Sequence, residues 1–249
     1  SVPAALTGVA ATGVLGTRLT MAGGSGTGTA LLVVAVLLWA VLLPAVLAHL
    51  GRRAPGAAYL VCVATQSLAV LAATLAPPLR AAWLMWPALA AFVLGVLLWL
   101  PVVALFDWRQ LRTGRGDHWV VGGSVSISAL ASAKLAAGSA APLRWAPGLH
   151  GALRGATLGL LLFAFAWYVV LVVCEVRWPR PEYDVRRWAT VFPLGMAAVA
   201  STTSGTALRT PVLTTAGKVL LWPALLVWGV VAAGAVRTQV RANRRPGGA

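Results

Sequence analysis

The stretch LLVVAVLLWAVLLPAVL, from Leu31 to Leu47, decides the fold class because it carries no charged residue and is apolar on every helical face. It lies within a predicted span over 29–50, whose length of about 20 residues at 1.5 Å per residue matches the ~30 Å hydrocarbon core of a bilayer. A helix with bulky side chains all round suits contact with lipid. This stretch therefore predicts a transmembrane helix on the outside of a bundle.

The rest of the chain has the same apolar character. Of its 249 residues 59% are hydrophobic and 10% are charged, and the mean hydropathy is +0.84, which excludes an ordinary soluble domain. Strand-like alternation is absent, so the sequence predicts an all-α polytopic membrane protein rather than a barrel. One transmembrane domain is predicted over 1–249, with a basic cytoplasmic tail at 237–249. The eight predicted spans are 2–20, 29–50, 56–76, 84–106, 119–137, 155–176, 188–207 and 216–236.

The basic residues predict how the chain crosses the membrane. A net charge of +15 suggests nucleic acid in a soluble protein, but here the bases lie between apolar spans, so membrane orientation explains them better. Thirteen of the 20 bases follow even-numbered spans. By the positive-inside rule that side is cytoplasmic, and with eight spans both termini face it, as in a multi-pass protein of the cell membrane. These bases are Arg52, Arg53, Arg109, Arg112, Arg115, Arg177, Arg180, Arg186, Arg187, Arg237, Arg241, Arg244 and Arg245.

Consecutive spans differ in side-chain size. The odd-numbered spans contain 25 Gly, Ser and Thr residues and the even-numbered spans contain 8; GGSVSISALASAK, from Gly122 to Lys134, is typical of the odd ones. This alternation predicts a two-helix hairpin repeated roughly every 60 residues, with odd helices inside and even helices outside. Two interpretations remain open: the small residues only allow close packing, or the inner helices enclose a path for a polar solute.

The ionisable residues favour an anion as that solute. A cation or proton path normally needs a carboxylate within the membrane, and none of the five acids lies at mid-depth in a span. Lys134 either snorkels to the interface or attracts anions at a pore mouth. The triplet Thr65, Gln66 and Ser67 either forms interhelical hydrogen bonds or lines the pore. The pore-lining candidates are Thr65, Gln66, Ser67, Ser124, Ser128, Lys134 and Thr202.

The sequence carries no pattern that predicts an enzyme, a metal site or a cofactor. Cys62 and Cys174 lie inside apolar spans without metal-ligand spacing, so both are interpreted as packing residues. Catalytic triads and paired carboxylates are absent from the sequence as well. Tryptophans at span ends, among them Trp119, are expected to form an interfacial belt, and His118 is expected to meet lipid headgroups.

Phe192 is the candidate gate. Of the five phenylalanines, it alone falls in an odd-numbered span. The following Pro193 cannot donate a backbone hydrogen bond and can bend the helix where the ring projects. Phe192 and Pro193 are therefore predicted to form an apolar constriction, which blocks a path by excluding water. The alternative is a core phenylalanine packed between two helices.

The chain also resembles the tellurite-resistance and dicarboxylate transporter family, which includes the plant guard-cell slow anion channels. The resemblance rests on VATQSLAVL from Val63, HWVVGGSVSISALASAKL from His118 and RRWATVFPLGMAAVAS from Arg186. It implies ten helices in five hairpins, odd helices around a central pore, homotrimers, and a phenylalanine on the ninth helix that occludes the pore. The present spans would be helices three to ten, so the family's first hairpin is missing before Ser1, either because the sequence is truncated or because the chain departs from the family.

From these features we expect an anion channel or transporter without a cofactor. Its candidate solutes are tellurite, sulfite, C4-dicarboxylates and small inorganic anions, and its other contacts are membrane lipid. The alternatives are a proton-coupled organic-acid carrier, which needs a titratable group within the membrane, and a noncatalytic scaffold in which the small residues only pack helices.

Overall fold

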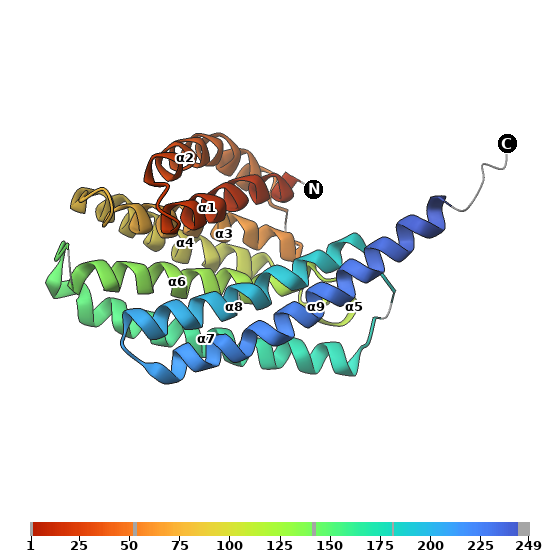
Figure 1. Cartoon of the computed structure of the whole chain (residues 1–249). Coiled ribbons are helices and arrows are strands. Elements are labelled where there is room, and N and C mark those ends of the chain that lie inside the picture. The colour runs from red at the N-terminus through yellow and green to blue at the C-terminus, as the bar shows by residue number, and fades with distance from the viewer. Residues whose placement is uncertain (1, 52–53, 141–142, 181, 244–249) are drawn as a thin grey trace.

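The computed structural model describes residues 2–51, 54–140, 143–180 and 182–243 of the chain, and those residues fold as an α-helical bundle (Figure 1). This confirms the predicted fold class. The α-helices are α1 (Leu6–Met21), α2 (Ser25–Ala48), α3 (Leu60–Leu75), α4 (Met85–Leu105), α5 (Gln110–Thr113), α6 (Val120–Ala140), α7 (His150–Arg177), α8 (Trp188–Ala207) and α9 (Pro211–Asn243). Short 3-10 turns occupy Val2–Ala5, Gly56–Tyr59, Ala82–Leu84, Asp117–Trp119, Pro147–Leu149 and Val185–Arg187.

Each predicted span corresponds to a long helix, and the differences lie at the ends. Helix α7 begins at His150 and α9 at Pro211, each five residues before the predicted start. Pro211 suits the first position of a helix because a backbone N–H at that position has no acceptor within the helix, so proline loses nothing by lacking one. Helix α9 also runs on through the predicted tail as far as Asn243. The predicted cytoplasmic bases Arg52, Arg53, Arg244 and Arg245 lie outside the described residues.

Six helical segments among the described residues are long and apolar enough to cross a bilayer. They are Ser25–Ala48, Gly56–Leu75, Ala82–Leu105, Asp117–Ser139, Pro147–Arg177 and Pro211–Val240. Helix α1 has 16 residues, and α8 has 20 residues rich in Ser and Thr, so neither reaches that standard alone. Eight membrane crossings therefore remain a prediction.

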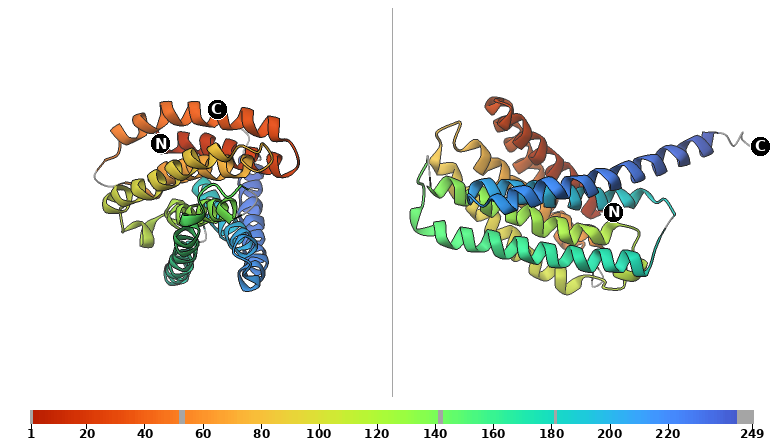
Figure 2. Two further views of the ribbon diagram at one scale, coloured as in Figure 1. Left: turned by 90° about the vertical axis from the view of Figure 1, so that its left-hand side faces the viewer. Right: turned by 60° about the horizontal axis from the view of Figure 1, so that its bottom comes forward.

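Inner and outer helices separate as the alternation of residue size predicts. In the most apolar stretches of α3 and α6, 89% of the residues are buried, against 17% in α2, 22% in α4, 33% in α7 and 11% in α9. The inner helices pack in the order α1, α3, α6, α8, and each hairpin places an outer helix against its inner one. Viewed along the bundle, α6 lies centrally while α2, α7 and α9 lie at the periphery (Figure 2).

The hairpin repeat is visible in the backbone as well. Each turn that joins an inner helix to the next outer one contains a residue with positive φ: Gly23 at 96°, Arg80 at 50°, Arg144 at 46° and Arg209 at 53°. These residues recur roughly every 60 positions, which is the predicted period. This left-handed region is unfavourable for arginine because its Cβ lies too close to the backbone. The geometry shared by these turns therefore outweighs the backbone preference of arginine.

The two ends of the bundle differ in how they are connected. We call the end that carries segments 49–59, 106–119 and 178–187 the basic end, and the other the opposite end. At the basic end the loops pair with one another, since Ala54 N donates to Leu105 O at 2.8 Å and Asp107 N donates to Ala54 O at 3.1 Å. At the opposite end, the α1–α2 and α8–α9 connections are turns of three residues each, 22–24 and 208–210. Loop structure is thus concentrated at the end predicted to be cytoplasmic.

Candidate functional site

A cavity of about 320 Å³ lies among the four inner helices. On α6 its lining residues Ile127, Leu130 and Lys134 recur at helical spacing, and so do Met196, Val199 and Thr203 on α8. All four inner helices therefore turn one face toward the same space. The full lining is Gly13, Val14, Thr17, Arg18, Met21, Ser67, Val70, Ile127, Leu130, Lys134, Met196, Val199 and Thr203.

The cavity is apolar along its length and positively charged at one end. Arg18 belongs to the last turn of α1, and Lys134 lies in the second half of α6, so both are toward the opposite end. None of the residues that line the cavity is acidic. Any small ion that enters from this end meets two cations and no carboxylate, which attracts anions and repels cations.

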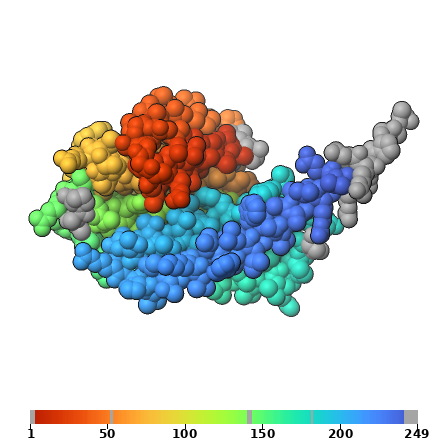
Figure 3. Space-filling model, viewed as in Figure 1, coloured from red at the N-terminus to blue at the C-terminus, as the bar shows by residue number. Residues whose placement is uncertain are grey.

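The cavity is open on its side between α1 and α8. Val14 on α1 is 44% exposed and Val199 on α8 is 49% exposed, although both line the cavity. Figure 3 views this face, with α1 in red above α8 and α9 in blue. In the described residues the inner helices thus form an arc rather than a closed ring.

Phe192 lies one helical turn before Met196 on the same face of α8 as the cavity lining. Its ring packs against Gly123 of α6, so closely that a Cβ on that glycine would lie 3.1 Å from the ring. Gly123 is itself one turn before the lining residue Ile127. The half-buried Phe192 side chain therefore lies next to the inner end of the cavity, toward the basic end. This is the position at which an aromatic ring can constrict a path along the inner helices.

Tyr168, on the outer helix α7, fixes the backbone beside this ring. Its hydroxyl donates to Pro193 O at 2.7 Å and lies 3.1 Å from Ser126 Oγ on α6. The Tyr168 ring covers Gly122, where an added Cβ would be 2.8 Å away. Sequence analysis missed this residue, although a phenol in the middle of an apolar outer span needs a hydrogen-bond partner and is a signal for such a contact.

The polar triplet of α3 points in three directions. Thr65 Oγ1 accepts a hydrogen bond from Trp39 Nε1 of α2 at 2.9 Å, and Gln66 Nε2 donates to Phe92 O of α4 at 3.0 Å. Ser67 alone of the three lines the cavity. Successive helical residues differ by about 100° in direction, so a triplet that is contiguous in sequence cannot share one face.

The other candidates lie around the cavity rather than in its lining. The Ser124 and Ser128 hydroxyls are buried and bond to carbonyls of α6 itself, Val121 O and Ser124 O. The Thr202 hydroxyl bonds to Ala198 O and lies against Gly217 of α9. The structure thus brings Ser67 and Lys134 together in one cavity and adds Arg18, which the sequence did not single out as pore lining.

A network of charged side chains joins the loops at the basic end. Arg180 donates to the carbonyls of Gly114 and Leu111, and Arg187 Nη1 pairs with Glu175 Oε1 at 2.7 Å. Asp184 accepts from Arg115 at 3.1 Å and from Arg186 at 3.0 Å. The hydrogen bonds from Arg186 hold the pKa of the Asp184 carboxyl below its usual range. These contacts tie the α4–α6 connection to the α7–α8 connection.

Two predictions about this end are wrong. His118 is fully buried beside Arg180, with His118 Nε2 and Arg180 Nη1 3.4 Å apart, and Trp119 is only 5% exposed. Neither side chain is placed to meet lipid headgroups. Both lie in the 3-10 turn Asp117–Trp119 that leads directly into the inner helix α6, so they are buried with that helix in the bundle. By contrast, Trp83 and Trp108 near outer helices are exposed.

Comparison with known protein families assigns the chain. Residues 3–236 match the family described as voltage-dependent anion channel, which covers nearly all of the chain. The chain belongs to this family. Family membership makes it a membrane protein of the anion channel and transporter class, in agreement with the resemblance seen in the sequence and with the six membrane-length helices.

Two curated relatives of this family member are uncharacterized membrane proteins of Mycobacterium tuberculosis, from strains CDC 1551 / Oshkosh and H37Rv. Each is 30% identical over 120 residues, which is 45% of this chain and 59% of the relative. The chain therefore matches about three fifths of the length of these relatives. No solved structure matches it.

Proposed function

We propose that this voltage-dependent anion channel family member conducts small anions across the cell membrane along a path centred on the cavity of the inner helices. The observation that carries the proposal is the cavity lining: four inner helices contribute to it, and it contains Arg18 and Lys134 but no acid. Cations near an entrance raise the local concentration of anions. Of the lining hydroxyls, those of Thr17 and Ser67 donate to Gly13 O at 2.8 Å and Ala64 O at 2.7 Å. They can donate to an anion only by turning away from these carbonyls, so they would hold it weakly enough to let it leave.

Phe192 is the proposed gate on this path. It lies one turn before the cavity lining of α8, and its ring fills the space above Gly123. An aromatic ring at a narrow point blocks ions by excluding water rather than by charge. Pro193 beside it weakens the helix ladder locally, so the ring is carried by a segment that can change its direction.

The decisive experiment is anion flux into liposomes that contain the purified chain. We expect the reversal potential to follow the anion gradient, and we expect tellurite, sulfite, a C4-dicarboxylate, chloride and nitrate to differ in rate. A reversal potential that follows the cation gradient would refute the proposal. One that follows the proton gradient would favour the proton-coupled organic-acid carrier.

Charge-removing variants test the entrance. Arg18→Gln combined with Lys134→Gln should lower flux more at low salt than at high salt, because exposed charges are screened beyond about 10 Å at 0.1 M. Arg154→Gln is the matched control, since this exposed arginine lies near the same end on the outer helix α7. An equal loss of flux in the control would show that surface charge in general, and not the cavity, governs entry.

Phe192→Ala tests the gate. If the ring constricts the path, flux rises while the protein remains folded and monodisperse. If Phe192 is only a core residue, the truncation costs about 3 to 5 kcal/mol of packing and flux does not rise. Phe163→Ala on the lipid-facing side of α7 is the matched control for removal of a ring.

Topology and assembly are part of the proposal. With both termini cytoplasmic, single cysteines introduced near Arg80 and Arg112 should be labelled from opposite sides of the membrane. The homotrimer implied by the family resemblance is tested by counting cross-linked subunits in the membrane. Labelling of both cysteines from the same side would contradict the eight-span topology.

A further inference from the structure

A groove separates the outer helices α7 and α9, which both pack on inner helices and diverge from one another (Figure 2). It holds two cavities, one of about 600 Å³ toward the opposite end and one of about 580 Å³ toward the basic end. One face of α9 lines both, because Val212, Ala216 and Leu220 in the first recur at the same helical spacing as Val227, Val230 and Gly234 in the second.

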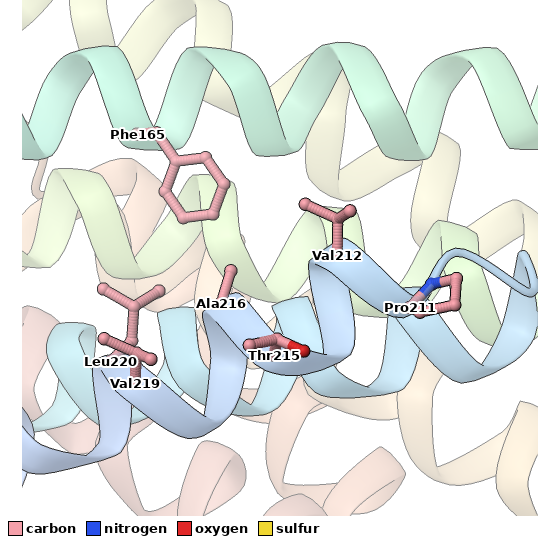
Figure 4. Close-up of a pocket in the computed structure, with 7 residues that line it drawn as sticks. All are labelled: Phe165, Pro211, Val212, Thr215, Ala216, Val219 and Leu220. Carbon is pink, nitrogen blue, oxygen red and sulfur yellow. The ribbon is translucent and has the colours of Figure 1, made fainter.

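The two cavities differ in chemistry. Toward the opposite end, Phe165 of α7 projects toward an α9 face made of Val212, Ala216 and Leu220 (Figure 4). No charged residue lines that cavity. Toward the basic end, the apolar wall of Leu194 and the α9 residues leads to the side chains of the charged network. The lining there includes Trp119, Glu175, Arg180, Glu182, Tyr183, Arg187, Thr190 and Arg237.

The charged wall of the basic-end cavity contains hydrogen-bond donors that the described residues leave without an acceptor. Trp119 Nε1 and Arg180 Nε are buried without a hydrogen-bond acceptor, and one acceptor of the same wall, Glu175 Oε2, is buried without a donor. Buried donors of this kind are costly unless a partner is supplied. Glu175 is engaged by Arg187 at 2.7 Å and lies 3.8 Å from Arg180, whereas the Arg237 side chain is exposed at the rim. The wall is therefore able to receive a negatively charged group.

The length of the apolar wall fits one leaflet. From Leu226 to Arg237 an α-helix rises about 16 Å, and half of a hydrocarbon core is about 15 Å. An acyl chain laid on this face would have its headgroup at the level of Arg237, where the charged network begins. Leu226 is 70% exposed and Val230 is 73% exposed, so this face is open to such a chain.

We propose that the basic-end cavity between α7, α8 and α9 binds an anionic phospholipid. One acyl chain lies along Leu226, Val227 and Val230, and the phosphate faces Trp119, Arg180 and Arg237. The occupied face of α8, with Thr190 and Leu194, is turned away from the face that bears Phe192. The lipid site is thus separate from the proposed anion path. The proposal of lipid binding does not depend on whether the protein conducts anions.

The experiment measures association of spin-labelled phosphatidylglycerol and spin-labelled phosphatidylcholine with the full chain in bilayers. We expect the anionic lipid to be preferred several-fold. Arg237→Gln should reduce that preference by about fivefold, since one basic residue near a headgroup contributes about that factor. Trp119→Phe, which removes the indole N–H together with the five-membered ring and keeps an aromatic ring, should reduce it as well.

Lys218→Gln is the matched control, because it removes the same charge from the same helix near the opposite end. It should leave the preference unchanged. Arg237 is exposed on a continuous helix, so Arg237→Gln keeps the proposal testable even if Trp119→Phe fails to fold.

Three results would overturn the proposal. The first is equal association of both lipids with the unmodified chain, and the second is a preference unaffected by Arg237→Gln. The third is displacement of the lipid. Displacement by inorganic phosphate would mean that the groove binds a free anion, and displacement by a second copy of the chain, cross-linked across α7 and α9, would mean that it binds a subunit.

Discussion

Helices α6 and α9 are both long enough to span a bilayer, yet 89% of the apolar stretch of α6 is buried and only 11% of that of α9. Helix α6 is built from Gly, Ala and Ser, whereas α9 exposes Leu226, Trp222 and Val230. Within the bilayer, moving a bulky apolar side chain from contact with lipid to contact with protein gains no hydrophobic free energy. The helices whose small residues let backbones approach closely therefore take the inner positions of the bundle. The comparison teaches that residue size, and not hydropathy, sorts these helices.

The largest expected effect comes from enlarging a glycine on each helix. Gly122→Val on α6 places a Cβ 2.8 Å from the Tyr168 ring, and that ring is held by hydrogen bonds on two sides. Overpacking of this kind costs about 1 to 3 kcal/mol. Gly229→Val on α9 has nothing within 4 Å and should be neutral. The free energies of unfolding of both variants in mixed micelles measure the difference, and equal losses would break the comparison.

The next effect tests how an outer helix acts on an inner one. Tyr168→Phe removes the hydrogen bond to Pro193 O and should cost about 1 kcal/mol. Because this bond fixes the segment that carries Phe192, basal anion flux should also rise. In a Phe192→Ala background the same change should add nothing to flux. A further rise in that background would show that Tyr168 acts elsewhere.

A smaller effect is expected at the hydroxyls. Thr65→Val loses the hydrogen bond from Trp39 of α2, and an interhelical bond in a membrane contributes about 0.6 kcal/mol on average. Thr12→Val is the control, since its hydroxyl bonds to Gly8 O of its own helix. Both losses are read from unfolding in mixed micelles. Equal losses would mean that the cross-helix bond contributes nothing beyond the intrahelical one.

The smallest effect concerns pH. Because Arg186 lowers the pKa of Asp184, the stability from this carboxylate is present above its ordinary pKa of about 4 and is lost as pH falls below that value. Asp184→Asn should flatten the thermal stability of the protein over that range. The residue is near the surface, so high salt should weaken the effect. An unaltered pH profile in the variant would show that the Arg186–Asp184 contact is not formed in solution.

The fold could be predicted because its signal is repetitive. The alternation of small-residue and bulky spans, repeated four times, predicted the helices, the hairpins and their inner or outer positions. The structure buries α3 and α6 inside the bundle, as predicted. Helix ends were less predictable. Arg154 interrupts the apolar run near the start of α7, so the sequence placed that start late, although a long basic side chain is tolerated near a helix end.

The candidate site was predicted only in part, because which neighbour a helical side chain faces depends on how the helices pack. Two of the pore-lining candidates, Ser67 and Lys134, lie in the lining of one cavity, and their role in a pore stays a prediction. Thr65 and Gln66 contact α2 and α4 instead, and no periodicity in the triplet could assign its three members. Arg18 joined the site through the packing of α1, and Tyr168 joined it from an outer helix by reaching past α6.

The modest hydropathy of α8 has a consequence for how the protein is made. Helix α8 leaves the ribosome before α9, yet it is not apolar enough to count as a stand-alone span, and only three residues, 208–210, separate the two helices. Helix α9 packs chiefly against α8. We therefore expect the translocon to release α8 and α9 together. Helix α9, with its bulky apolar side chains, then supplies the free energy of partition into lipid for α8. Helix α8, whose Ser and Thr residues lower its hydropathy, is for that reason poorly suited to enter lipid unaccompanied, and the α8–α9 hairpin serves as its unit of biogenesis.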